Sequence, residues 1–351
     1  MRKIRYPSLN GLRAVSIILV IFHHLEYSYN IDRNLINIKW LTPFIDLIED
    51  GPLGVNMFFV ISGFLITSLL YEEELATAAI SLKNFYTRRI LRIFPAYYFL
   101  LFVYFILQLL GIISISNASW LTALTYTKYL NWPLDWYTGH AWSLSIEEQF
   151  YLFWPLIFIA GDKVRKIAAA CLIIIVPVIR LYSFFHPAPW INDLTIFTRI
   201  DAIAVGCLFA LYKEKIILIL SNHWNKLFYF SVIILLFLRY LPTVPYKIHL
   251  ATFYIPLGLT HGTFASILIA LIMMYSIFGP HGVWFKILNS KVLNYIGVLS
   301  YSIYLWQQIF IMNTTYWFNQ YPFNLVLILI AALFSYYLIE RPFLKLKSKF
   351  N

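Results

Sequence analysis

Charged residues are scarce in this sequence. Asp, Glu, Lys and Arg make up only 12% of its 351 residues, whereas 61% are hydrophobic and 19% are aromatic. Soluble domains carry about 25% charged and about 45–50% apolar residues, and the shortage of charge here extends over the whole length. The composition therefore excludes an ordinary soluble domain and predicts an all-α, polytopic membrane protein.

Cysteine is nearly absent as well. Cys171 and Cys207 both lie in apolar segments, which excludes a disulfide framework and a thiolate metal site. The eight histidines are scattered without metal-ligand spacing, so we expect no metal. The net charge is +11, but the basic residues form short clusters between apolar runs. That pattern is typical of membrane topology rather than of a basic binding face, and we expect no nucleic-acid partner.

Apolar runs long enough to cross a bilayer recur along the chain. The criterion of about 20 residues per span predicts about ten transmembrane helices. The N-terminal run resembles a signal peptide, but it contains Arg13 and lacks a small-x-small cleavage site, so we interpret it as a retained first span. The predicted spans are 9–29, 52–71, 93–115, 143–160, 167–184, 196–212, 227–241, 261–279, 292–314 and 323–340.

Lys and Arg are unevenly distributed between the connections. Most of the 27 cations fall in alternate connections and at the two chain ends, and the positive-inside rule places those segments in the cytoplasm. Both termini are therefore predicted to be cytoplasmic. We find no internal repeat, and we expect residues 1–351 to form a single transmembrane domain without a fused periplasmic domain.

Two connections contain more than a bare loop. Residues 75–92 are interpreted as a helix lying in the cytoplasmic interface, capped by Ser81, with Pro95 opening the third span. Residues 116–142 form a predicted outer loop that is rich in Trp and Tyr. Such residues are typical of the headgroup belt, and they are equally suited to stacking on a sugar.

The first predicted span carries ionisable residues at both ends. Arg13 and His24 would lie within about 20° of one helix face and roughly 16 Å apart along its axis. One interpretation is that Arg13 extends to the cytoplasmic surface and His24 lies at the outer interface. The other treats intramembrane charge as functional, because a guanidinium suits a phosphate group and an imidazole suits proton transfer near neutral pH.

Two further clusters have both a structural and a functional interpretation. Arg89 and Arg92 are three residues apart and face the same way on a helix. They are either a plain positive-inside cluster or a clamp for a phosphate group. Ser62, Gly63 and Phe64 lie in the second span. The small pair there permits close helix packing, or it lets a thin ligand arm pass.

The start of the fourth span combines His140, Trp142, Ser143 and Glu147. An acid at a helix N-terminus is favoured by the helix dipole, which is the structural interpretation. Entering from the outer side, however, Glu147 would lie at the depth of His24. A carboxylate that orients an imidazole is the usual arrangement for a general base.

Polar residues also lie in later spans. Arg199 and Asp201 are two residues apart and do not face each other on a helix, so each needs a partner elsewhere in the bundle, whether for structure or for substrate. Arg180 lies near an outer helix end, where we expect it to extend to the membrane surface. Tyr301 and Tyr304 share a face and offer hydroxyl groups for packing or for substrate.

In chain order these segments resemble the integral-membrane acyltransferase family 3, the group that O-acylates bacterial surface polysaccharides. The resemblance covers nearly the whole chain, and the ordered set is more specific than any one motif. The matching stretches are Leu9-Asn-Gly-Leu-Arg13 with His24, Phe58-Phe-Val-Ile-Ser62-Gly63-Phe64, Arg88-Arg89-Ile-Leu-Arg92-Ile-Phe-Pro95, His140-Ala-Trp142-Ser143-Leu-Ser-Ile-Glu147, Arg199-Ile-Asp201 and Ser300-Tyr301-Ser-Ile-Tyr304-Leu-Trp306.

The resemblance implies a multi-pass protein of the bacterial inner (cytoplasmic) membrane. It implies acyl-CoA, with acetyl-CoA favoured, as a cytoplasmic co-substrate rather than a permanently bound cofactor. The acyl group would pass to a hydroxyl of a cell-surface or lipid-linked glycan at the outer side. By the same resemblance Arg13 and His24 are the family's paired arginine and histidine, and Arg89 and Arg92 are its cytoplasmic arginine pair.

The sequence also departs from the family pattern. Asn10 and Asn56 stand where many members carry aspartate, and Gln307 stands where many carry histidine. If that histidine normally contacts a substrate, the donor or acceptor here differs from the common case. Some members have a fused periplasmic hydrolase-like domain, so we expect this chain to act alone or with a separate periplasmic acyltransferase partner.

The leading hypothesis is an O-acyltransferase in which His24, oriented by Glu147, is the general base. The three arginines named above would hold the donor phosphates, and residues 62–64 would line the path of its thioester arm. The alternative is a transporter or flippase of a lipid-linked sugar, with the buried charges along its route; the absence of an inverted repeat weighs against it. A third hypothesis is a non-catalytic scaffold for polysaccharide synthesis.

Overall fold

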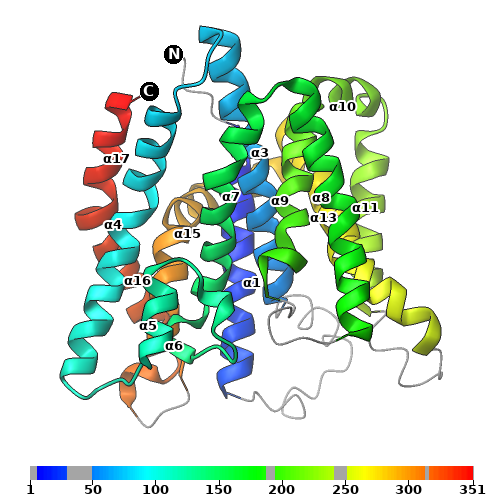
Figure 1. Ribbon diagram of the computed structural model, residues 1–351. Helices are drawn as coiled ribbons and strands as arrows, with labels where there is room; N and C mark the ends of the chain where they lie inside the picture. Colours follow the sequence, from blue (N-terminus) through cyan, green and yellow to red (C-terminus); the bar gives the residue numbers. More distant parts are fainter. Residues whose placement is uncertain (1–5, 30–49, 187–193, 241–250, 313–315, 351) are drawn as a thin grey trace.

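The computed structural model describes residues 6–29, 50–186, 194–240, 251–312 and 316–350. Within these ranges the chain is an assembly of helices and contains no strand. The longer helices run side by side, and the two described chain ends lie at the same end of the bundle (Figure 1). The all-α expectation is therefore confirmed for the described residues.

A helix lies at each predicted span. Five of the described helices are long and apolar enough to cross a membrane, namely Leu9–Ser28, Gly51–Thr77, Leu82–Leu109, Asp162–Phe185 and Phe323–Lys347. The helices at the predicted spans are α1 (Leu9–Tyr29), α3 (Gly51–Thr77), α4 (Leu82–Leu109), α7 (Ala141–Ile159), α8 (Asp162–Phe185), α9 (Ile196–Leu211), α11 (Trp224–Tyr240), α13 (Ala251–Phe278), α15 (Lys291–Phe310) and α16 (Phe323–Phe334).

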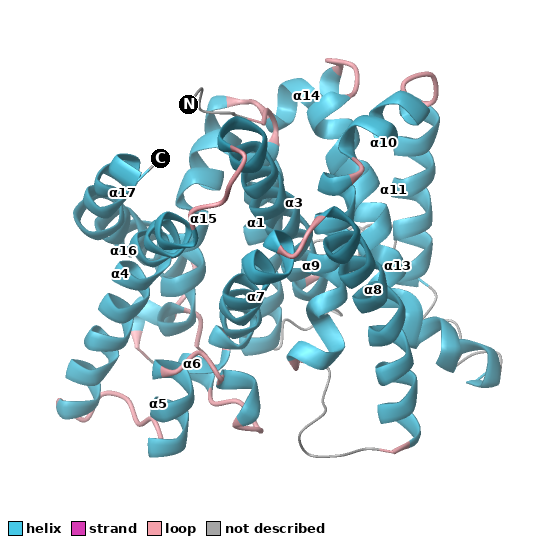
Figure 2. Ribbon diagram, turned by 45° about the horizontal axis from the view of Figure 1, so that its top comes forward, coloured by secondary structure: helices cyan, strands magenta, loops and turns pink. Residues whose placement is uncertain are grey.

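Shorter helices connect these long ones (Figure 2). At the end of the bundle that holds the chain ends, α10 (Lys213–Leu220) precedes α11 and α14 (Val283–Leu288) precedes α15. After α16 the chain continues as a π-helical segment, Ser335–Glu340, and then as α17 (Arg341–Lys347). The outer loop expected at 116–142 contains α5 (Asn117–Leu124), the 3-10 turn η1 (Lys128–Leu130) and α6 (Trp136–Gly139).

Helix α3 is the most enclosed of the candidate spans, and it packs against α1 and α9. Its contact with α9 depends on two glycines. A Cβ atom on Gly63 would lie 2.0 Å from the carbonyl oxygen of Ile203, and one on Gly206 would lie 2.1 Å from that of Val60. Only glycine allows the backbones to come this close, which is the usual function of small residues between membrane helices.

The segment before the third span differs from expectation. Ser81 caps a helix as predicted, since its hydroxyl accepts a hydrogen bond from the amide of Asn84 at 3.3 Å. The prediction of a separate interfacial helix over residues 75–92 is wrong, however, because α3 extends to Thr77 and α4 runs without interruption from Leu82 through Pro95. Residues 82–92 thus belong to the same continuous helix as the third predicted span.

Three consecutive acids near the C-terminal end of α3 connect the helices at the end of the bundle that holds the chain ends. We call this the charged end. Glu73 accepts a hydrogen bond from Arg88 of α4 at 2.6 Å, and Glu74 accepts one from Arg165 of α8 at 2.7 Å. The hydroxyl of Tyr6 donates to Glu72 at 3.1 Å. Neighbouring residues on a helix point in different directions, so these three acids reach three different parts of the chain.

A buried ion pair connects α8 and α9. The guanidinium of Arg180 pairs with Asp201 and also donates to the Thr263 hydroxyl at 3.0 Å and to the Thr198 carbonyl at 2.7 Å. The expectation that Arg180 extends to the membrane surface is therefore wrong, because the guanidinium has a carboxylate to pair with inside the bundle. Asp201 finds its partner on another helix, as expected.

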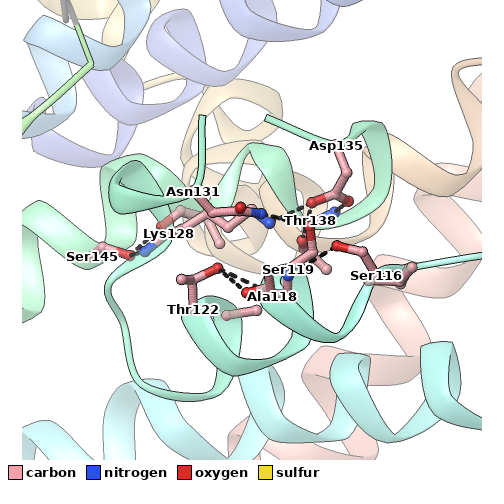
Figure 3. A network of polar contacts seen from close by, with 12 residues as sticks. Ser116, Ala118, Ser119, Thr122, Lys128, Asn131, Asp135, Thr138 and Ser145 are labelled. Atoms are coloured by element: carbon pink, nitrogen blue, oxygen red, sulfur yellow. Dashed lines mark hydrogen bonds and ion pairs between the residues drawn. The ribbon is translucent and has the colours of Figure 1, made fainter. Parts of the chain in front are cut away.

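The opposite end of the bundle, which we call the cap end, is covered by α5, η1 and α6. Lys128 is 0% exposed and pairs with Asp135. Asp135 also accepts hydrogen bonds from the amide and hydroxyl of Thr138, at 2.8 and 2.7 Å, and thereby caps α6 (Figure 3). Burial lowers the pKa of Lys128. Burial acts to raise the pKa of Asp135, but the hydrogen bonds from Lys128 and Thr138 outweigh it and lower that pKa.

This pair generates a stability prediction. Asp135→Asn keeps an oxygen for the helix cap but leaves the buried Lys128 ammonium without its counter-charge, which costs about 3–5 kcal/mol when a buried pair is broken. We expect a lower melting temperature in detergent for Asp135→Asn, and recovery of most of the loss in the double variant Lys128→Met/Asp135→Asn. A double variant as unstable as the single one would contradict this explanation.

Candidate active site

A cavity of about 100 Å³ lies among α1, α3, α4, α7 and α15. By this measure one water needs about 10–15 Å³, so the cavity is large enough for an acyl group and part of a thin chain. Many of the residues singled out in the sequence meet here although they come from separate segments. Those that line the cavity are Arg13, Ser62, Arg89, Arg92, Ser143, Glu147, Tyr301 and Tyr304.

Three arginines dominate the electrostatics of the cavity. The guanidinium of Arg89 lies over the ring of Tyr151 at 4.8 Å, and that of Arg92 lies 5.9 Å from the ring centre of Tyr301. Arg13 reaches the same space from α1. The spacing of Arg89 and Arg92 does bring both onto one face, as predicted. A planar guanidinium group can donate two parallel hydrogen bonds to two oxygens of a phosphate or carboxylate. The cavity therefore suits an anionic ligand.

Glu340 is a part of this site that the sequence analysis did not find. Its buried carboxylate accepts a hydrogen bond from Arg92 at 3.0 Å and another from the Ser302 hydroxyl at 2.5 Å. It lies in the π-helical segment, a distortion that is frequent at functional sites. In the sequence, the only signal for Glu340 is its position as an acid at the end of the last predicted span. Because Arg341 follows it directly, it resembles a charged residue at the membrane surface rather than a site residue.

Glu147 lines the cavity, next to Ser62 and within electrostatic reach of Arg13 and Arg89. Ser62 is hydrogen-bonded to the hydroxyl of Tyr151. Among the described residues no contact joins Glu147 to His24. The acid lies beside Arg13, near the arginine end of the predicted face of α1 rather than its histidine end.

The wall of the cavity nearest the cap end is formed by the hydrogen-bonded pair of Tyr304 and Ser143. The Tyr304 hydroxyl donates to the carbonyl of His140 at 2.7 Å and lies 2.7 Å from the Ser143 hydroxyl, which is its other partner. The ring of His140 packs edge-on against Tyr304 with 5.4 Å between centroids. This pair ties α15 to the start of α7 and separates the cavity from His140.

His24 lies beyond this wall and does not line the cavity. Its ring packs edge-on against Trp136 at 6.2 Å and lies 5.7 Å from the ring of His23. Gln307 and His140 are its other polar neighbours. The cavity therefore lies at the Arg13 end of α1, with His24 further along the same helix, and their shared helix face stays a prediction.

The remaining predicted site residues lie outside the cavity. Gly63 is at the contact of α3 with α9, and Phe64 is buried with its ring edge-on to Tyr6 at 5.3 Å. Trp142 is half-buried and packs edge-on against Phe59 at 6.1 Å. Arg199, half-buried in the first turn of α9, lies away from the cavity as well, and Asp201 is held by Arg180.

Comparison with known proteins yields one family and several named relatives. A family model described as "Acyltransferase domain", of acyltransferase family 3, matches residues 6–340. The O-acetyltransferase OatA of Staphylococcus aureus (strain NCTC 8325) is 32% identical over 375 residues, which covers 97% of this chain and 57% of the relative. A protein named putative O-acetyltransferase from S. aureus (strain COL) is 30% identical over 387 residues, covering 98% and 58%.

The chain thus spans a little over half the length of the curated relatives it matches. No solved structure matches it significantly. The similarity to these relatives extends over nearly all of this chain, and so over the segments that meet in the cavity and around His24.

The Arg92–Glu340 contact generates a binding prediction. Glu340→Ala removes the carboxylate that holds the Arg92 guanidinium, so the arginine must be ordered again when a ligand binds. With coenzyme A as a probe that carries several phosphates, we expect binding roughly tenfold weaker, about 1.4 kcal/mol, in calorimetric titrations of the chain in nanodiscs. Arg92→Ala and the double variant should lose a similar amount, because the two residues act together.

Glu73→Ala is the matched control, since it breaks an acid–arginine pair outside the cavity whose arginine, Arg88, is on the same helix as Arg92. It should leave coenzyme A binding unchanged. If Glu340→Ala bound coenzyme A as tightly as the unaltered chain, or more tightly, Glu340 would not position Arg92 for a ligand.

Proposed function

This chain belongs to acyltransferase family 3, and on that premise we propose that it is a membrane O-acyltransferase. It moves an acyl group, most simply acetyl, from cytoplasmic acyl-CoA to a hydroxyl of a cell-surface or lipid-linked glycan. The observation that carries the proposal is the arrangement along α1: an arginine-lined cavity begins at Arg13, and an imidazole, His24, lies beyond its far wall.

The charged end of the bundle is the proposed cytoplasmic side. It holds both described chain ends (Figure 1). Arg88, Arg165 and Lys166 also lie there, near the starts of α4 and α8, and Lys and Arg favour the inner side of a membrane. The protein would then span the cytoplasmic membrane several times. The donor enters at this side, where acyl-CoA is made.

The arginines of the cavity would bind the phosphates of the donor. Arg89 and Arg92 lie about two and three turns into α4, and Arg13 lies about one turn into α1. All three line the cavity, and a donor that enters from the charged end would reach them first. Bound in this direction, the donor's thin arm points toward Ser143 and Tyr304. Glu147 partly balances the positive charge, so a ligand with several negative charges is favoured without leaving the empty cavity strongly repulsive.

His24 is the proposed general base at the other end. For this step the Tyr304–Ser143 pair must open, so that the donor's thioester and the acceptor meet. His24 then accepts the proton of the acceptor hydroxyl while the hydroxyl oxygen attacks the thioester carbonyl. A carbon–oxygen bond forms, the carbon–sulfur bond breaks with its electrons on the sulfur of coenzyme A, and the proton passes from His24 to that sulfur. Gln307 is a polar neighbour of the His24 ring, whereas Glu147 lies beside Arg13.

A glycan assay tests this function. Cells that lack the protein should lose the mass increment of the acyl group from their surface glycans, and the unaltered chain should restore it. His24→Ala should not restore it, because loss of a general base costs about 10²–10⁴-fold in rate. Its melting temperature and coenzyme A binding should be retained, since His24 lies outside the cavity.

His23→Ala is the control, because the adjacent imidazole packs against Gly51 on another side of α1. It should restore the glycan mass. Full activity of His24→Ala would contradict the proposed base. If no surface glycan changed mass without the protein, transport of a lipid-linked sugar or a scaffolding role would replace acyl transfer.

A further inference from the structure

A group of buried polar side chains lies beside His24, on the far side of the Tyr304–Ser143 pair from the cavity. We propose that His140 and Gln307 form, together with His24, a subsite that binds hydroxyl groups of the glycan acceptor. The inference rests on the proposed function, and it deepens it by assigning residues to the acceptor.

The first observation is that these side chains lack hydrogen-bond partners. Both ring nitrogens of His140, both amide atoms of Gln307 and Nδ1 of His24 are buried and unpartnered among the residues that the structure describes. His140 is 5% exposed and Gln307 is 0% exposed. Buried polar atoms are nearly always hydrogen-bonded. Several unpartnered atoms in one place therefore indicate a site for a polar ligand rather than a packed core.

The second observation is that the surrounding structure holds these groups in place. His140 is the residue between α6 and α7, and its carbonyl accepts the hydrogen bond from Tyr304. The indole nitrogen of Trp136 donates to the carbonyl of Gln308 at 2.8 Å and thereby ties α6 to α15. The backbone next to both unpartnered side chains is thus fixed by contacts that do not use the side chains themselves.

The chemistry of the group favours hydroxyls over ions. A neutral imidazole offers one donor and one acceptor, and a carboxamide offers two donors and one acceptor. A sugar hydroxyl also donates and accepts, whereas a phosphate or carboxylate only accepts. Lys128 and Asp135, the charged side chains that act on His140, are paired with each other. A neutral ligand rich in hydroxyls fits this donor and acceptor set best.

An aromatic surface adjoins the same place. The ring of Tyr27 stacks on Trp136 with 5.9 Å between centroids and 9° between planes, and Tyr27 is 70% exposed. Trp136 in turn contacts His24. An exposed aromatic face that leads to buried hydrogen-bonding groups is suited to a sugar ring, whose C–H face is apolar and whose edge carries the hydroxyls.

The subsite also has the correct relation to the donor. Tyr304 lines the cavity on one side and touches His140 on the other. An acceptor held by His140 and Gln307 would therefore lie against the wall that faces the donor's acyl group, with His24 beside its hydroxyl. This placement separates the neutral acceptor from the arginines that bind the anionic donor.

The test uses the full chain in nanodiscs with radiolabelled acetyl-CoA and with glycan fragments released from cells that lack the protein. Gln307→Leu removes both amide atoms at similar volume. We expect a KM for the fragments that is raised roughly tenfold or more, with the KM for acetyl-CoA unchanged. The melting temperature should stay the same or rise, because two unpartnered buried polar atoms have been removed.

Two further variants sharpen the result. Gln307→His keeps a donor and an acceptor and should retain a KM for the fragments within a few-fold of the original. Ser231→Ala removes an unpartnered buried hydroxyl from α11, away from this site, and should change neither KM. His140→Phe should raise the acceptor KM as Gln307→Leu does.

The outcomes separate the inference from the function beneath it. Transfer by the unaltered chain, with the acceptor KM unchanged in both Gln307→Leu and His140→Phe, would overturn the subsite alone. A lower melting temperature of Gln307→Leu with equal changes in both KM values would assign Gln307 a structural role and also overturn it. An unaltered chain that binds acetyl-CoA but transfers nothing would contradict the proposed function itself.

Discussion

The cost of holding three guanidinium groups inside an apolar bundle is the constraint on which the rest of the structure depends. Arg13, Arg89 and Arg92 face one cavity, and buried charge is tolerated only where partners compensate for lost water. Glu147 and Glu340 supply carboxylates, and the rings of residues 151 and 301 supply π faces. These partners come from three separate helical segments, α7, α15 and the π-helical segment, so the cavity exists only when the bundle is assembled.

Buried polar groups elsewhere in the described chain divide into two kinds. The Arg180–Asp201 and Lys128–Asp135 pairs satisfy one another and connect elements that pack together. The groups around His24 do not satisfy one another, although they are as deeply buried. Paired groups stabilise the fold, whereas unpaired ones cost stability and persist where function needs them. Single unpartnered atoms also occur elsewhere, as at Ser231, so the cluster of them around His24, rather than burial or one missing partner, marks the candidate binding residues here.

Sequence reasoning located the helices and the residues that share a helix face. Arg89 with Arg92 and Tyr301 with Tyr304 were grouped by their spacing of three, and the structure brings all four to one cavity. Such periodicity says which residues point the same way, because helical geometry is local. The continuity of α4 through Pro95 was missed, because the bundle can compensate for the hydrogen bond that proline removes.

Relations between helices were predicted less well. Depth estimates from span ends put Glu147 level with His24, but the acid lies beside Arg13. The Arg180 pair and the role of Glu340 depend on which helices are neighbours, which hydrophobic patterns do not specify. Gln307 was noticed only as a departure from a family pattern. Its unpartnered amide became informative when the surrounding side chains were known.

The central claim is that donor and acceptor meet from opposite ends of the line along α1. The most direct measurement uses sealed vesicles in which the charged end faces outward, with labelled acetyl-CoA supplied outside and glycan fragments enclosed inside. Labelled glycan should accumulate inside these vesicles, and none should form when donor and acceptor are both inside. Transfer that requires both substrates on the same side would contradict the account.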